Sequence, residues 1–146
     1  MAEASAKDSV VHLVHRASQR GDELFALHAD GFSPRQYEVL RAVAQGNGIS
    51  QADITAATGI DRSSTAVFVA RLMRQGLLKR RRLKRDHRSY AVRLTPAGQE
   101  MFDRMNLSAA KADEAFLAPL SSDQRQSLIL IIGILIKQRS GDATGA

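Results

Sequence analysis

The sequence predicts a mainly α-helical fold that contains one small β-hairpin. Over most of the chain, apolar residues recur three or four positions apart, as on the buried face of a helix. Serine, threonine or aspartate precedes several of these stretches, and proline twice follows at the first helical position, which is typical of helix starts. Between Gly76 and Leu94 the period changes to the alternation of a β-strand.

Two helices are predicted near the N-terminus. The first spans Asp8 to His28. Its inward stripe consists of Val10, Val14, Ala17, Gly21, Leu24 and Phe25. Ser33 and Gln36 have the spacing of a capping box around Pro34, so a second helix is expected from here to about Gln45, where glycines interrupt the pattern.

The next two helices are separated by a tight turn. Ser50 and Asp53 repeat the capping-box spacing ahead of a short helix that ends near Gly59. Asp61 can cap the following helix, which Gly76 can close in a left-handed conformation. The inward stripe of this last helix is predicted to be Ala66, Val69, Leu72 and Met73. Two helices joined in this way are typical of a helix-turn-helix.

A β-hairpin and two more helices complete the chain. The strands are expected over Leu77 to Leu83 and over Tyr90 to Leu94, with Lys84 to Ser89 as a basic loop. Thr95 and Pro96 start a long helix that continues toward Leu117. Pro119 interrupts it, and Ser121 with Gln124 opens a final helix.

Composition favours one globular domain in a reducing compartment. The chain has 146 residues, 44% of them hydrophobic, and no cysteine. Because the N-terminus lacks the apolar segment of a secretory signal, a cytoplasmic location is expected. The longest apolar run, Leu128 to Ile136, has nine residues, whereas a membrane span needs about 20. A helix that is apolar all round must be buried all round, so this run indicates a subunit interface.

Positive charge is concentrated in one part of the sequence. Ten of the 21 lysines and arginines lie between Arg71 and Arg93, where Asp86 is the only acidic residue. Such a field attracts polyanions through phosphate neutralisation, although basic residues also serve simply as a solvated surface. We therefore expect nucleic acid as the partner.

The fourth helix has the chemistry of a reader of the major groove. Arg62, Ser63, Ser64 and Thr65 crowd its first turn, where side chains reach bases and amides reach phosphates. Ser64, Val67, Phe68 and Arg71 are expected on its outward face. Arginine can bind guanine and an apolar side chain can contact a thymine methyl group, but the serines also suit a helix start and Phe68 also suits the core.

The basic loop is expected to enter the minor groove. A narrow minor groove concentrates negative potential, and Arg88 is the residue predicted to insert there. Asp86 either orients a neighbouring guanidinium or simply forms the turn. Arg80, Arg81 and Arg82 lie on a strand, so alternate side chains point to opposite faces.

Short motifs with ordered spacing recur between Ser50 and Gly98. They are Ser50-Gln51, Gly59-Ile60-Asp61-Arg62-Ser63, Gly76-Leu77-Leu78, Asp86-His87-Arg88 and Leu94-Thr95-Pro96-Ala97-Gly98. With these motifs, this stretch resembles the winged helix-turn-helix core of MarR-family regulators. The resemblance implies a single domain over residues 1–146, with a DNA-binding lobe at about 34–98 and dimerisation helices at about 8–29 and 96–139.

The resemblance also implies a homodimer on a pseudo-palindromic operator, often a repressor released by a small aromatic or anionic ligand. It assigns the wing arginine to Arg88 and its partner to Asp86, while His87 replaces a frequent second arginine. The predicted DNA-binding residues are Ser50, Gln51, Arg62, Ser63, Ser64, Thr65, Val67, Arg71, Arg82, Lys84, Arg85, Asp86, His87 and Arg88.

Candidate effector-binding residues lie on the first two helices and could hold an anion, although such side chains are more often solvated or paired. They are His12, His15, Arg16, Arg20, Tyr37 and Arg41. No metal or cofactor is expected, because the histidines lack a third ligand at suitable spacing. No catalytic motif is present, so an enzyme is not expected. A winged helix that docks RNA or protein is the alternative function.

Overall fold

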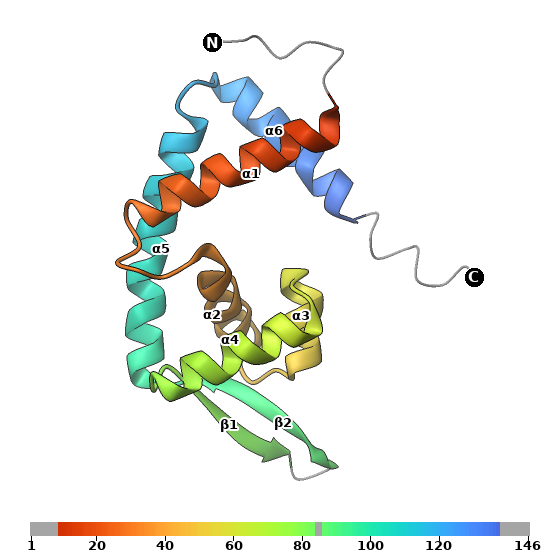
Figure 1. The fold of residues 1–146 in the computed structure, drawn as a ribbon, viewed down its shortest axis with the longest axis vertical. Helices are drawn as coiled ribbons and strands as arrows, with labels where there is room; N and C mark the ends of the chain where they lie inside the picture. The colour runs from red at the N-terminus through yellow and green to blue at the C-terminus, as the bar shows by residue number, and fades with distance from the viewer. Residues whose placement is uncertain (1–8, 84–85, 138–146) are drawn as a thin grey trace, which may run out of the picture.

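The computed structural model describes residues 9–83 and 86–137. Within them, six helices and a two-stranded antiparallel hairpin follow in the predicted order (Figure 1). The elements are α1 Val10–Ala26, α2 Pro34–Gly46, α3 Gln51–Thr58, α4 Arg62–Arg74, β1 Leu78–Leu83, β2 Asp86–Leu94, α5 Pro96–Leu117 and α6 Ser122–Lys137. The predicted fold class, mainly helical with a β-hairpin wing, is confirmed.

The predicted helix starts are confirmed by the caps. The Ser33 hydroxyl accepts a hydrogen bond from the Gln36 backbone N–H (3.2 Å), and the Gln36 side chain accepts one from the Ser33 N–H (2.9 Å). Ser50 and Asp53 form the same capping box at the start of α3. Thr95 caps α5, with proline at the next position. These side chains satisfy N–H groups that a helix start otherwise leaves without a partner.

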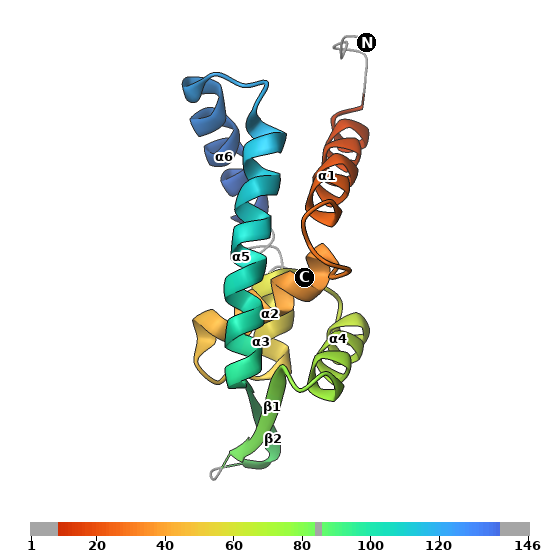
Figure 2. The same ribbon diagram turned by 90° about the vertical axis from the view of Figure 1, so that its left-hand side faces the viewer.

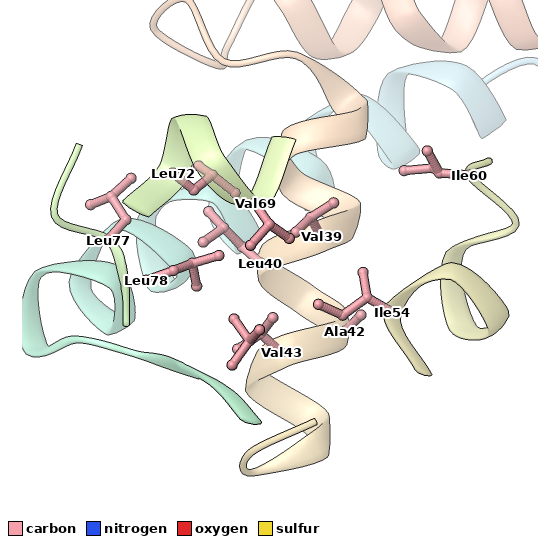
Figure 3. Packing of buried hydrophobic residues seen from close by; sticks show 11 residues of the cluster. Val39, Leu40, Ala42, Val43, Ile54, Ile60, Val69, Leu72, Leu77 and Leu78 are labelled. Carbon is pink, nitrogen blue, oxygen red and sulfur yellow. The ribbon is translucent and has the colours of Figure 1, made fainter. Parts of the chain in front are cut away.

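One hydrophobic core joins α2, α3, α4 and the hairpin into a lobe (Figure 3). Leu40 of α2, Ile54 of α3, Leu72 of α4 and Val92 of β2 are fully buried in it. Each such side chain stabilises the fold by about 1.5–3 kcal/mol through its removal from water. The core therefore fixes the orientation of α4 relative to the wing.

The hairpin is longer than the alternation in the sequence predicted. β1 pairs with β2 from Leu78 opposite Leu94 to Leu83 opposite Asp86, with an irregularity after Arg82. The prediction that Lys84 to Ser89 form a loop is wrong for residues 86–89, whose backbone belongs to β2. Strand pairing uses backbone groups, so polar side chains do not prevent it.

A separate bridge ties the hairpin to the α2–α3 connection. The backbone N–H of Val92 donates to the carbonyl of Ile49 (2.7 Å), and the N–H of Ile49 donates to the carbonyl of Val92 (3.2 Å). This reciprocal pair holds the base of the wing against the lobe.

A second hydrophobic cluster lies where the C-terminal half of α1 packs against α5 (Figures 1 and 2). Leu24 and Phe25 are buried there with Met105 and Ala112. The predicted inward stripe of α1 is thus confirmed at its C-terminal end, whereas Val10 and Val14 at its N-terminal end are exposed in the single chain. The stripe continues beyond the part of α1 that α5 covers.

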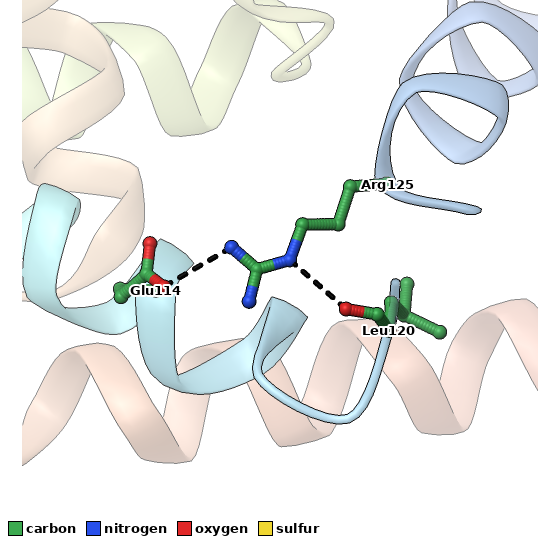
Figure 4. Close-up of polar contacts among 3 residues, drawn as sticks. All are labelled: Glu114, Leu120 and Arg125. Carbon is green, nitrogen blue, oxygen red and sulfur yellow. Dashed lines mark hydrogen bonds and ion pairs between the residues drawn. The ribbon is translucent and has the colours of Figure 1, made fainter. Parts of the chain in front are cut away.

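The turn between α5 and α6 is held by polar contacts (Figure 4). Arg125 donates hydrogen bonds to the Leu120 carbonyl (3.2 Å) and to the Glu114 carboxylate (3.1 Å). Ser121 and Gln124 exchange hydrogen bonds as the predicted capping box. These contacts set the direction in which α6 leaves α5.

The apolar run of α6 is exposed in the single chain. No α6 residue is buried, and Ile129, Leu130 and Ile134 each expose more than half of their surface. No other described element covers the helix, so the chain alone does not bury this run, and its burial in a subunit interface stays a prediction. No helix in the described residues is long and apolar enough to cross a membrane.

Candidate nucleic-acid interface

The start of α4 is fixed by its cap. The carboxylate of Asp61 accepts a hydrogen bond from the Ser64 backbone N–H (2.8 Å). Hydrogen bonds from the backbone and side chain of Ser64 lower the pKa of this carboxyl group below its usual value. Arg62 and Ser63, in the same turn, are exposed. The first turn therefore presents a guanidinium and a hydroxyl beside helix N–H groups, an arrangement that suits phosphate and base contacts.

The two faces of α4 differ in burial. Val69 and Leu72 lie in the lobe core, as predicted, and Met73 packs against it. Arg71 is exposed, and Val67 exposes 56% of its surface. The outward face thus combines one apolar and one cationic side chain.

Three α4 residues differ from the predicted faces. Ala66, predicted to be inward, is exposed. Phe68, predicted to be outward, packs partly against the core. Thr65 exposes 1% of its surface and is hydrogen-bonded to Thr55 of α3 (3.1 Å), so it links the two helices and is not available for DNA contact. A simple helical-wheel argument misses the burial of Thr65 because it does not include the contact with α3.

The α3 residues of the predicted interface lie at its N-terminus. The Ser50 hydroxyl accepts a hydrogen bond from the Asp53 N–H (3.1 Å) and lies 2.8 Å from the Asp53 carboxylate. Gln51 is half-buried. Ser50 therefore has a structural role in the helix cap, and only its remaining exposed surface is open to a partner.

The wing carries guanidinium groups on both faces. The guanidinium groups of Arg80 and Arg82 lie 5.2 and 5.6 Å from the centroid of the Tyr90 ring, and Arg82 donates a hydrogen bond to the Tyr90 hydroxyl (3.2 Å). Arg81 lies between them in sequence, so its side chain points to the opposite face. The predicted alternation of the three arginines agrees with this register.

No function was predicted for Tyr90 from the sequence. An aromatic residue among arginines on an alternating strand is the pattern that could have indicated this cation–π cluster. The hydrogen bond from Arg82, and then its charge, lower the pKa of the Tyr90 hydroxyl.

The predicted tip of the wing is described only in part. The backbone of residues 86–89, including Asp86, His87 and Arg88, belongs to β2, but their side chains lie outside the described residues. Lys84 and Arg85 lie outside them altogether. Insertion of Arg88 into a minor groove thus stays a prediction.

A cavity of about 230 Å³ lies between α1, α2 and α5. Tyr37 and Arg41 line it, whereas the other predicted effector residues do not. Those residues are His12, His15, Arg16 and Arg20, all of them exposed on α1. Helical spacing in the sequence placed these four residues on α1. It could not show that the cavity lies at the C-terminal end of α1.

Tyr37 is held firmly in this cavity. Its ring lies 5.6 Å from that of Phe25 and 6.2 Å from that of Phe102, and its hydroxyl donates to the Asn106 side chain (2.9 Å). Burial raises the pKa of the Tyr37 hydroxyl, the nearby charge of Arg41 lowers it, and nearby carboxylates raise it further.

Three carboxylates line the same cavity and were not predicted: Asp22, Glu38 and Asp113. They come from three different helices, so no local pattern in the sequence brings them together.

Among residues 9–83 and 86–137 no group of three or more metal-ligating side chains has the arrangement of a metal site.

Comparison with known proteins identifies the family of this fold. A model of the MarR family matches residues 30–89. A transcriptional regulatory protein for the hcr operon of Thauera aromatica is 32% identical over 111 residues, which are 76% of this chain and 67% of that protein. The chain belongs to the MarR family.

Solved MarR-type structures agree with this assignment over nearly the whole chain. The BpsR regulator of Bordetella bronchiseptica, whose DNA binding is regulated by 6-hydroxynicotinic acid, has a TM-score of 0.82 at 25% identity and covers 88% of this chain and 98% of its own. The PcaV regulator of Streptomyces coelicolor, solved with its natural ligand, has a TM-score of 0.81 at 30% identity and covers 98% and 99%. This MarR-family chain is thus a transcriptional regulator with the winged helix-turn-helix fold.

Proposed function

We propose that this chain is a cytoplasmic, homodimeric regulator that binds specific sites on double-stranded DNA and represses transcription until a small ligand releases it. The observation that carries the proposal is that α4 has one buried face and one exposed, partly cationic face. The lobe core fixes one face of this helix, while Arg62, Ser63, Val67 and Arg71 project from the rest of it beside a basic wing. A helix held in place by the core, with exposed arginines beside a basic hairpin, suits recognition of the major groove.

Two kinds of contact are proposed for this surface. Arg62 and Arg71 have the donors for guanine edges or phosphates, and Val67 suits a thymine methyl group. The wing supplies charge for the backbone and, at Arg88, a minor-groove contact. The interface proposed here consists of Ser50, Gln51, Arg62, Ser63, Ser64, Val67, Arg71, Arg82, Lys84, Arg85, Asp86, His87 and Arg88, without Thr65.

A second copy of the chain is the proposed cover for α6. Its exposed isoleucines and leucines, with exposed Val10, Val11 and Val14 of α1, form apolar surface that water disfavours. Isologous pairing through these helices would place two α4 helices on one duplex, which is why a pseudo-palindromic site is expected.

The cavity between α1, α2 and α5 is the proposed ligand site. Phe25 and Tyr37 offer aromatic surface, and Arg41 is the single cation among its lining residues. A ligand with one aromatic ring and one acidic group fits this set, whereas a polyanion would meet the three carboxylates. The position of the cavity between the α1–α5 region and the lobe allows a ligand to change the angle between them.

The DNA proposal is tested by selecting genomic fragments with the purified protein and measuring their affinity across a salt series. We expect a symmetric footprint and an affinity that falls steeply with salt, because several phosphates are neutralised. Arg88→Ala should weaken binding by about 1–3 kcal/mol while the protein stays folded.

Lys111→Ala is the matched control, because Lys111 is an exposed cation of α5 remote from the wing and α4. If Arg88→Ala and Lys111→Ala bind the selected site equally well, the wing contact is refuted. Equal affinity for the DNA duplex and for RNA of the same sequence would instead favour the RNA-docking alternative.

A further inference from the structure

A second cavity, of about 240 Å³, lies at the base of the wing. It is lined by the C-terminal end of α2 and the turn that follows, by β1 and β2, and by the first turn of α5. No residue of α4 lines it. Figure 2 shows α4 on one side of the lobe, and α5 with the α2–α3 connection on the other. The cavity therefore faces away from the proposed reading helix.

Two cations face each other in this cavity. Lys79 of β1 lies directly opposite Arg93 of β2, so their side chains share one face of the hairpin. Like charges directly opposite each other destabilise an antiparallel pair. The ion pairs formed by the described residues lie on α1 and between α5 and α6, so no described carboxylate neutralises these cations.

The Arg93 guanidinium is held in position by the turn after α2. Gly48 has a φ of +96°, and a Cβ atom there would lie 2.8 Å from Nε of Arg93 and 3.0 Å from its Nη2. The guanidinium thus lies against the glycine backbone, in space that a side chain would occupy. An arginine held in this way loses less conformational freedom when it binds a ligand.

The remaining polar lining consists of amides. Asn47 and Gln99 add side-chain donors, and no carboxylate lines the cavity. The cavity between α1, α2 and α5 has the opposite character, with three carboxylates and one arginine. Of these two cavities, the one at the base of the wing is therefore the one without an acidic side chain that would repel an anion.

We propose that the cavity at the base of the wing binds a small oxyanion, the phosphate or carboxylate group of a free small molecule, between Lys79 and Arg93. The planar guanidinium suits two parallel hydrogen bonds to such a group, and the ammonium neutralises its remaining charge. Bound there, the anion bridges both strands of the wing to the turn after α2. This site is independent of the proposed DNA surface and of the proposed effector cavity.

The test uses inorganic phosphate and the full-length protein without DNA. Thermal unfolding is compared in sodium phosphate and in sodium chloride of the same ionic strength. At about ten times the dissociation constant, specific binding should raise the midpoint by about 4–5 °C more than chloride does. Lys79→Gln and Arg93→Gln should lose this increment, and each should be at least as stable as the parent in chloride because a repulsion has been removed.

Arg81→Gln is the control, since Arg81 is an exposed arginine of β1 that does not line the cavity. Phosphate also stabilises proteins generally by exclusion from their surface, so an equal increment in all four proteins would overturn the proposal. Isothermal titration with phosphate at room temperature gives a second readout that does not depend on unfolding. Absence of binding to free protein, together with a salt slope of DNA binding reduced by about one in Lys79→Gln, would assign the two cations to the DNA backbone and also overturn it.

Discussion

Single residues connect the wing to the long helix that follows it. The Thr95 N–H donates to the Leu77 carbonyl (3.0 Å), and the Thr95 hydroxyl donates to the Gly76 carbonyl (2.6 Å). The same hydroxyl accepts from the Gly98 N–H (3.0 Å). Gly98 is buried against this crossing, and a Cβ atom there would overlap the carbonyl oxygen of Leu77. Glycine at this position therefore allows α5 to begin directly on the start of β1.

Gly98→Ala should lower the free energy of unfolding by about 1–3 kcal/mol, because the backbone of Leu77 must move to admit a methyl group. Gly21→Ala is the matched control. Gly21 lies within α1, and a Cβ atom there would meet no neighbouring side chain or distant backbone within 4 Å, so alanine should raise the free energy of unfolding. The expected gain is about 0.5–1 kcal/mol. Urea denaturation of the two variants measures both values, and equal effects of the same sign would contradict the close approach at Gly98.

At the scale of elements, the wing and the α1–α5 region place the two tyrosines of the chain in opposite environments. Tyr90 lies on the wing close to two guanidinium groups, which favour its ionised form. Tyr37 is partly buried between aromatic rings, which disfavours ionisation. The pKa of each tyrosine therefore reports the charge and burial of the element on which that tyrosine lies.

An alkaline titration followed by tyrosinate absorbance should show two separate transitions, one below and one above the usual tyrosine pKa of about 10. The chain has two tyrosines and no tryptophan, so the signal is unambiguous. Tyr90→Phe should remove the lower transition and Tyr37→Phe the upper one. Arg82→Gln should move the lower transition up toward the usual value, because it removes the hydrogen bond and the charge that lower the pKa of Tyr90. If both tyrosines of the parent protein ionise in a single transition, the two different environments of Tyr37 and Tyr90 are refuted.

At the scale of the whole molecule, the lobe buries its apolar side chains within one chain, but α6 does not. The lobe encloses its core within one chain, whereas α6 carries a run of exposed isoleucines and leucines. Exposed apolar surface of this extent marks an association site. The proposed homodimer would bury it and would set the spacing of the two reading helices.

Ile134→Asp should convert the proposed dimer into monomers, since a buried unpaired carboxylate costs several kcal/mol. Val67→Asp on α4 is the control, because Val67 exposes 56% of its surface and Ile134 exposes 61%, yet Val67 lies outside the proposed dimer surface. Light scattering after size-exclusion chromatography gives the mass of each variant. A parent protein that is monomeric at micromolar concentration would refute the dimer.

The sequence by itself determined the order of elements, the caps and the position of α4. Caps and turns depend on residues three or four positions apart, as at Ser33 and Gln36, so the chain encodes them locally. The family motifs around Asp61 and Thr95 are local for the same reason. These features were predictable because no distant contact is needed to form them.

Tertiary structure alone decided which side chains are available at each site. Thr65 lies in the first turn of α4, as predicted, but α3 buries it. Lys79 and Arg93 meet because of strand register, and the Tyr37 hydroxyl reaches Asn106 across 69 positions of sequence. Burial and electrostatic environment depend on residues that the fold brings together from distant segments, and local periodicity contains no information about them.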